Sequence, residues 1–247
     1  GETILRPTKE DVFDALAADL LLHAHNCVRS FGDVHLALSG GSTPLPFYQH
    51  LMIDPRYRDF PWRRTHIWLV DERRVPLDDD RSNSKHITAY LDPAHTDIPK
   101  NNLHIYDWCA DDIEAKFTHD LQHCLAWREK GHDRLDFALL GLGGDGHTAS
   151  LFPNSPALEE RAQPIRINAG PSVTPPDRVT MTYPLLNAAR FCAFLVLGES
   201  KRDILARLAA ATQEHPTPTP DDIRELPALG IRPVEGALRW YIDHAAC

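Results

Sequence analysis

Short apolar segments alternate with segments of helical periodicity along most of this 247-residue chain, and this order restricts the fold more than any other feature. The expected strands cover residues 34–38, 66–70, 103–106, 135–141, 178–182 and 191–197. The expected helices lie between Thr8 and Gly32 and at residues 44–52, 83–91, 113–125, 185–190 and 199–211, and residues 240–246 are typical of a final helical segment. Because strand, helix, strand order favours parallel pairing, we predict an α/β fold, a three-layer sandwich with a mainly parallel, Rossmann-like sheet and helices on both faces.

The length permits one large domain or two small ones. A loop rich in proline and threonine lies at residues 214–220, and the segment after it is too short to fold alone. We therefore predict a single domain over residues 1–247.

Composition excludes several classes of partner. The net charge of −9 argues against a nucleic-acid surface, and no apolar run approaches the ~20 residues of a membrane helix. The five cysteines are odd in number and far apart, without a Cys-x-x-Cys pair, which favours reduced thiols. The first residues lack a basic segment followed by an apolar core. We expect a cytoplasmic protein, although an upstream targeting segment could have been removed.

A glycine-rich loop follows the expected strand at residues 135–141 and carries His147. In open α/β sheets, ligands bind outside the carboxyl ends of strands, so this histidine is well placed for chemistry. A side chain with an ordinary pKa of about 6.5 can take and return a proton near neutral pH. The competing interpretation is a structural histidine bonded to backbone, and the four glycines at 141, 143, 144 and 146 make it weaker.

Two further loops occupy equivalent places after strands. Residues 39–44 read Ser-Gly-Gly-Ser-Thr-Pro, and backbone N–H groups at such a helix start bind phosphate well. Residues 71–74 read Asp-Glu-Arg-Arg, where an arginine can grip an oxyanion bidentately. Each loop also has a structural interpretation, as a capped turn and as a self-paired ion cluster. Together the three loops predict a site for a small phosphorylated molecule rich in hydroxyl groups.

No set of zinc ligands stands out in the sequence, so we expect no metal. His119 and His123 are four residues apart on a helix but lack a catalytic glutamate between them. His23 and His25 are a weaker pair still. Both pairs are more typical of a solvated helix face.

The chain resembles the 6-phosphogluconolactonases. The resemblance rests on residues 38–44, on Asp71 to Arg73 with residues 75–76 and 82–83 beyond them, and on residues 141–153. It extends to residues 176–182, 187–190, 198–201 and 240–243, so it covers nearly the whole chain.

The resemblance implies hydrolysis of 6-phospho-D-glucono-1,5-lactone to 6-phosphogluconate without a cofactor, after glucose-6-phosphate dehydrogenase in the pentose phosphate pathway. It implies that His147 is the catalytic base and that Asp71 and Arg73 line the same site. The implied groups for binding substrate and its phosphate are Gly40, Gly41, Ser42, Thr43, Asp145, Gly146, Arg178 and Lys201.

Two alternatives remain at this point. Glucosamine-6-phosphate deaminases share the Ser-Gly-Gly-Ser-Thr-Pro turn, but their histidine loop usually continues toward Asn-Glu-Pro, whereas Ser150 to Pro153 here reads Ser-Leu-Phe-Pro. That family also tends to carry an aromatic residue where this chain has Arg73. A non-catalytic sugar-phosphate sensor is the second alternative, although such regulators add a DNA-binding segment and this chain begins with one core-packed helix.

Overall fold

The computed structural model describes residues 1–92, 96–171 and 173–247, and a six-stranded sheet forms its centre. The strand order is β1-β9-β8-β5-β2-β3, and every neighbouring pair in this sheet runs parallel. The strands are β1 (Glu2–Arg6), β2 (Val34–Leu38), β3 (Thr65–Leu69), β5 (Phe137–Leu140), β8 (Phe191–Val196) and β9 (Ala237–Asp243). Every residue of β2, β5 and β8 is buried, as expected for strands covered on both faces. The predicted fold class is confirmed.

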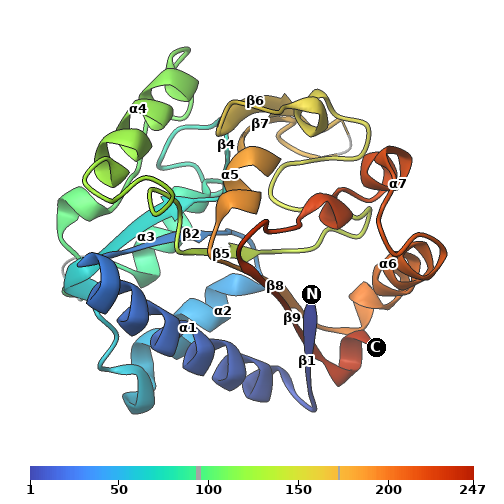
Figure 1. The fold of residues 1–247 in the computed structure, drawn as a ribbon, viewed down its shortest axis with the longest axis horizontal. Helices are drawn as coiled ribbons and strands as arrows, with labels where there is room; N and C mark the ends of the chain where they lie inside the picture. The colour runs from blue at the N-terminus through green and yellow to red at the C-terminus, as the bar shows by residue number, and fades with distance from the viewer. Residues whose placement is uncertain (93–95, 172) are drawn as a thin grey trace.

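Helices cover both faces of the sheet, with α1 and α2 on one side and α4 and α5 on the other (Figure 1). The helices are α1 (Lys9–Phe31), α2 (Pro44–Ile53), α3 (Asn83–Tyr90), α4 (Ile113–Leu125), α5 (Tyr183–Ala188), α6 (Arg202–Glu214) and α7 (Pro220–Glu225). Helix α1 begins with a capping box at Thr8 and ends at Gly32 in the left-handed conformation. Its buried stripe packs on β9, β1 and β2.

A second, antiparallel sheet of order β4-β7-β6 lies above one face of the central sheet (Figure 1). Its strands are β4 (Asp71–Arg73), β7 (Asp177–Met181) and β6 (Ile165–Ala169). The expectation of a loop at residues 71–74 is therefore wrong: Asp71 to Arg73 form β4, directly after β3. The cause is tertiary, because β4 has a partner only when β7, a hundred residues later, lies beside it.

The predicted helix at residues 240–246 is also wrong. Residues up to Asp243 belong to β9, which fills the place between β1 and β8, and only residues 244–246 form a 3₁₀ turn. A run such as Trp-Tyr-Ile is compatible with either a strand or a buried helix. Here it forms a strand because it pairs with both β1 and β8. Residues 103–106 form no strand, and only an isolated bridge joins Leu103 to Ile67.

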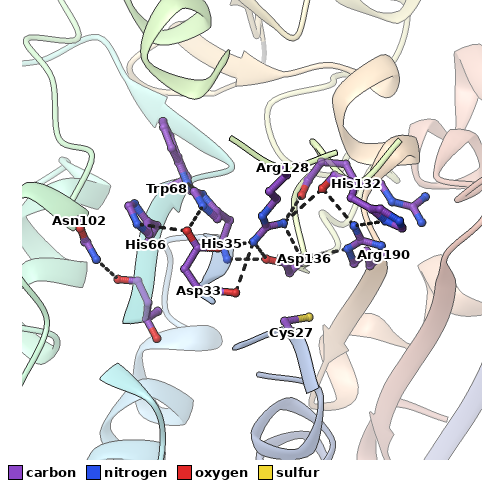
Figure 2. A network of polar contacts seen from close by, with 12 residues as sticks. Cys27, Asp33, His35, His66, Trp68, Asn102, Arg128, His132, Asp136 and Arg190 are labelled. Atoms are coloured by element: carbon purple, nitrogen blue, oxygen red, sulfur yellow. Dashed lines mark hydrogen bonds and ion pairs between the residues drawn. The ribbon is translucent and has the colours of Figure 1, made fainter. Parts of the chain in front are cut away.

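A buried ion network fastens the amino-terminal side of the central sheet (Figure 2). Asp136, which is fully buried just before β5, accepts hydrogen bonds from both terminal nitrogens of Arg128 and from Nε of Arg190. It also accepts one from the backbone N–H of His35 on β2, at 2.8 Å. A second carboxylate, Asp33, contacts Arg128 at 2.6 Å. The network therefore joins β2, β5 and the segments that precede β5 and β8.

Within the described residues, no helix is both long enough and apolar enough to span a membrane.

Candidate active site

A pocket of about 260 Å³ lies where the three predicted loops meet. Its size is near the lower end of the ~300–1,000 Å³ typical of ligand sites, which suits one small metabolite. The residues that line it are Ser39, Gly40, Gly41, Ser42, Thr43, Pro44, Asp71, Arg73, Asn83, Gly141, Leu142, Gly143, His147, Ala149, Leu195 and Lys201. The structure thus brings together residues as far apart in the chain as Ser39 and Lys201.

The sheet topology explains this meeting. Strand β2 lies between β3 and β5, so the loops that follow these three strands emerge side by side at one edge. The chain leaves β2 toward β3 on one side, while β5 pairs on the other, and ligands collect at such a switch point.

The turn from Gly40 to Thr43 leads into α2, with Pro44 as the first helical residue. The N–H groups of these four turn residues have no acceptor in the part of the chain that the structure describes. Gly40 must lack a side chain, because a Cβ there would lie 2.0 Å from Oδ1 of Asn83. Free donors at a helix start carry partial positive charge, so the turn is suited to an anion.

His147 is held by its own loop. Its Nδ1 lies 2.6 Å from Oδ1 of Asp145, which also accepts the backbone N–H of His147. An imidazole that donates from Nδ1 to a carboxylate keeps its Nε2 lone pair for another proton. No hydrogen-bond partner of Nε2 is found among the described residues, and the ring is 27% exposed. The ring also packs on Phe152 and over Gly143, where a Cβ would lie 2.1 Å from Nδ1.

The pKa of Asp145 reports the strength of this pair. Burial alone raises the pKa of the carboxyl, but the hydrogen bond and charge of His147 outweigh it, and the pKa lies below its ordinary value. The carboxylate therefore remains ionised beside the imidazole at neutral pH, where it stabilises a protonated ring.

Asp71 and Arg73 reach the pocket from β4. Oδ2 of Asp71 accepts a hydrogen bond of 2.6 Å from Ser150, which ties β4 to the histidine loop. Arg73 donates to the carbonyl of Arg81 and has no carboxylate within ion-pair distance in the described chain. The alternative interpretation, in which residues 71–74 form ion pairs among themselves, is therefore wrong for Arg73.

Glu72, between them, is a fully buried anchor rather than a pocket residue. It accepts backbone N–H groups of Arg73, Asn83 and Ser84, and the hydroxyl of Ser82. Burial raises the pKa of Glu72, and these hydrogen bonds oppose the shift. Because its contacts join β4 to the start of α3, Glu72 fixes the direction in which its two neighbours point.

Of the two remaining predicted cations, Lys201 lines the pocket and Arg178 lies beside Arg73, outside the lining. Arg178 on β7 is the register partner of Arg73, is only 5% exposed, and has no carboxylate at ion-pair distance in the described residues. Burial and then the charge of Arg73 lower the pKa of Arg178. Lys201 lines the pocket and donates to the carbonyl of Leu142 at 2.6 Å. Burial lowers the pKa of Lys201, while Asp145 opposes the shift.

Three predicted residues do not line the pocket. Asp145 lies against His147, Arg178 lies beside Arg73, and Gly146 packs against another segment. A Cβ at Gly146 would lie 2.8 Å from Leu226, and its carbonyl accepts the N–H of Ala228. Direct contact of these three with a substrate stays a prediction.

Sequence reasoning missed several pocket residues. Asn83 has a buried Oδ1 without a partner in the described structure, and Ala149 adopts a positive φ of 50° at the pocket wall. A non-glycine residue in that conformation is strained, and such strain concentrates at functional sites. Leu195 and Leu142 supply apolar wall. Asn83, Leu142 and Ala149 had a usable signal, since they lie within the segments that carry the resemblance, whereas Leu195 lies outside them.

The fold and the pocket define a doubly covered α/β protein that binds its ligand at the carboxyl ends of parallel strands. Residues 7–240 match the family described as glucosamine-6-phosphate isomerases/6-phosphogluconolactonase. A 6-phosphogluconolactonase of Nostoc sp. is 36% identical, over 94% of this chain and 91% of that protein. A crystal structure of 6-phosphogluconolactonase from Thermotoga maritima has a TM-score of 0.78 and 28% identity, over 98% of this chain and 100% of the other.

A larger relative, the GDH/6PGL endoplasmic bifunctional protein of Homo sapiens, is 36% identical over 96% of this chain. The chain spans only 29% of the length of that relative. This chain belongs to the glucosamine-6-phosphate isomerase/6-phosphogluconolactonase family. The family resemblance derived from the three loops is thereby confirmed.

Proposed function

We propose that this chain hydrolyses 6-phospho-D-glucono-1,5-lactone to 6-phosphogluconate, with residues 1–247 acting as one domain. The observation that carries the proposal is the pocket itself. It is lined both by an imidazole whose Nδ1 is bonded to a carboxylate and by a turn whose N–H donors have no acceptor among the described residues. The names of its relatives in the Nostoc and Thermotoga comparisons support the same reaction.

His147 is the proposed general base. Its Nε2 takes a proton from a water molecule, and the resulting hydroxide attacks C1 of the lactone to form the C–O bond. Asp145 stabilises the imidazolium formed in this step. As the tetrahedral intermediate collapses, the bond between C1 and the ring oxygen breaks, and His147 returns its proton to that oxygen. A positioned base contributes about 10²- to 10⁴-fold to such a reaction.

The cations and donors divide the remaining work. Arg73 and Arg178 are neighbours without carboxylate partners in the described chain, and a doubly negative phosphate relieves the repulsion between them. Lys201 and the turn from Gly40 to Thr43 provide further anion contacts. Asn83 also lines the pocket, and its side-chain N–H donates to the carbonyl of Asp71, which fixes its position beside the turn. Asp71, already bonded to Ser150, holds the wall in place.

The substrate class implies a place in metabolism. The lactone is the product of glucose-6-phosphate oxidation, so the reaction follows glucose-6-phosphate dehydrogenase and needs no nucleic acid or membrane as a partner. We also propose a cytoplasmic location, supported by five free cysteines.

A direct assay tests the function. Lactone formed by glucose-6-phosphate dehydrogenase is passed to 6-phosphogluconate dehydrogenase, and the second reduction of NADP⁺ reports hydrolysis. We expect the purified chain to accelerate this step well above spontaneous decay. Ammonia release from glucosamine 6-phosphate would instead identify a deaminase. Tight binding of 6-phosphogluconate with lactone decay left at the spontaneous rate would identify a sensor, and either outcome contradicts the proposal.

Replacement of Gly143 by alanine tests whether the position of His147 matters. The new Cβ would lie 2.1 Å from Nδ1 of His147 and 2.7 Å from Oδ1 of Asp145, so the pair must separate. A displacement of about 1 Å can cost about 10²-fold in rate, and we expect a loss of that order in kcat. Gly144→Ala is the matched control, because a Cβ there meets nothing within 4 Å. Equal kcat values for the two variants would contradict the assigned geometry.

A further inference from the structure

A cluster of histidines lies at the amino-terminal ends of the central strands, on the side of the sheet away from the candidate active site. His35 near the start of β2 and His66 near the start of β3 are register partners, and their rings stack with centroids 4.3 Å apart. His104 and the thiol of Cys124 on α4 approach the same place. The proposed lactone hydrolysis uses none of these groups.

Three of these side chains bring ligand atoms close together. Nδ1 of His66 lies 3.0 Å from Nε2 of His104, with the ring planes 15° apart and the centroids 5.3 Å apart. Rings so nearly parallel, with nitrogens this close and centroids this far apart, meet edge to edge rather than face to face. The ligand atoms of His66, His104 and Cys124 all lie within 4.8 Å of one another.

Metal ions bind imidazole in its uncharged form. Burial, and then the charges of the neighbouring histidines, lower the pKa of His104 to about 3. Burial also lowers the pKa of His66, to about 4, and the nearby carboxylate of Asp33 only partly opposes this shift. Burial raises the pKa of the Cys124 thiol, so an entering ion must displace its proton.

The surroundings hold the two rings in place. Trp68 stacks on His104 with centroids 3.5 Å apart and planes 5° apart. Nε1 of Trp68 donates to His35, whose other nitrogen lies 3.4 Å from Asp33. The same carboxylate lies 3.9 Å from Nε2 of His66 and is held by Arg128 (Figure 2). A carboxylate that accepts a hydrogen bond from the outer nitrogen is the usual support of a metal-binding imidazole, and at 3.9 Å Asp33 is near that position of His66 but beyond hydrogen-bond distance.

His66 gives the cluster an edge at the surface. Asp33 and His66 are among the residues that line a surface pocket of about 520 Å³, with Asn102 and the exposed Trp127 at its wall. The other carboxylate and histidine group, formed by Asp14, His50 and Asp54, offers no comparable site, because Arg56 already bonds both of its carboxylates at 2.6 Å.

We propose that Nδ1 of His66, Nε2 of His104 and the sulfur of Cys124 bind one divalent ion of the zinc class. Two imidazoles and a thiolate suit Zn²⁺ or Co²⁺, which prefer tetrahedral nitrogen and sulfur ligands. Tetrahedral bonds of about 2.0–2.1 Å separate two nitrogens by about 3.3 Å, so the two nitrogens must part by a few tenths of an ångström. Both rings must also turn, because their nitrogens now face each other along the line between the ring centroids. Binding forms two metal–nitrogen bonds and one metal–sulfur bond. The proton shared between the two rings moves to the other nitrogen of its own ring, and the thiol proton is released to water. The ion would link three parts of the chain: β3, which carries His66; the segment between α3 and α4, which carries His104; and α4, which carries Cys124.

Cobalt titration of the chelator-treated full-length chain tests the proposal. We expect one equivalent of Co²⁺ to produce visible d–d bands and a near-ultraviolet band from charge transfer between thiolate and cobalt, both abolished by Zn²⁺. Cys124→Ser should lose the charge-transfer band. Its affinity for Co²⁺ should fall by at least about 10-fold, since even replacing a residue that only supports a metal ligand lowers metal affinity about 10- to 100-fold. Cys109→Ser is the matched control, because Cys109 is an exposed free cysteine. It should behave as the unaltered protein does.

Thermal unfolding gives a second readout that does not depend on colour. Zn²⁺ should raise the Tm of the unaltered chain and of Cys109→Ser, because an ion that binds the folded state alone stabilises it. His66→Gln should lose that rise, and it keeps the test open if Cys124→Ser does not fold. His119→Ala controls for binding by the exposed histidine pair on α4 and should change nothing. The absence of a thiolate band in the unaltered chain, or a band that survives in Cys124→Ser, would overturn the proposal.

Discussion

Replacing His147 with alanine is expected to lower the kcat of lactone hydrolysis by about 10²- to 10⁴-fold, the contribution of one positioned general base. The substitution removes the only side chain whose nitrogen both lines the pocket and is oriented by a carboxylate among the described residues. The ring is partly exposed and packs on glycine and Phe152, so its removal leaves the buried core intact. The coupled dehydrogenase assay measures kcat, and circular dichroism verifies the fold.

Two companion variants make this result specific. Asp145→Asn keeps the shape of the side chain but removes the charge that stabilises the imidazolium, so we expect a smaller loss in kcat with little change in KM. His119→Ala, at an exposed position of α4, should retain full activity. A folded His147→Ala protein with unaltered kcat would end the assignment of this histidine as the base.

The largest effect on stability is expected at Asp136, far from the pocket. Replacement by alanine leaves the buried guanidinium of Arg128 with one carboxylate instead of two, and Arg190 without its ion-pair partner. It also removes the acceptor of the His35 N–H. Breaking a buried pair in this way costs about 3–5 kcal/mol of unfolding free energy, a large share of the ~5–15 kcal/mol typical of a domain. Urea unfolding measures the difference.

An exposed ion pair provides the matched control. Asp97 contacts Arg63 at 3.2 Å, but their side chains are 65% and 78% exposed. Such a pair contributes about 0–1 kcal/mol, so Asp97→Ala should be nearly neutral. If Asp136→Ala unfolds within about 1 kcal/mol of the unaltered chain, the network contributes little to stability, contrary to our expectation.

Elements with strong local signals were predictable. Helix α1 follows from its cap at Thr8, its apolar stripe and the stop at Gly32, and the structure shows all three. Strand β8 follows from an uninterrupted apolar run that is buried at every residue. In both cases, the residues that form the element also carry the information that specifies it.

Elements that depend on a distant partner were not predictable. Strand β9 takes its form from β1 and β8 on either side, and β4 pairs with β7 about a hundred residues away. The same holds for the cluster of His66, His104 and Cys124. The spacing of its three members along the sequence is not that of a metal-binding motif. They meet only because β3, α4 and the segment between α3 and α4 pack together.

The primary structure by itself determined the alternation of strands and helices, the glycine loops after three strands, and the chemistry of the side chains on them. These features depend on backbone conformation and hydrophobic period, which act within a few residues. The tertiary structure alone decided which loops are neighbours and that Asp145 orients His147 at 2.6 Å. It also decided that Arg73, in the pocket, has Arg178 beside it and that neither has a carboxylate partner among the described residues. Strand order and burial set those relations, because contacts between segments far apart in the chain form only when the sheet closes them into one core.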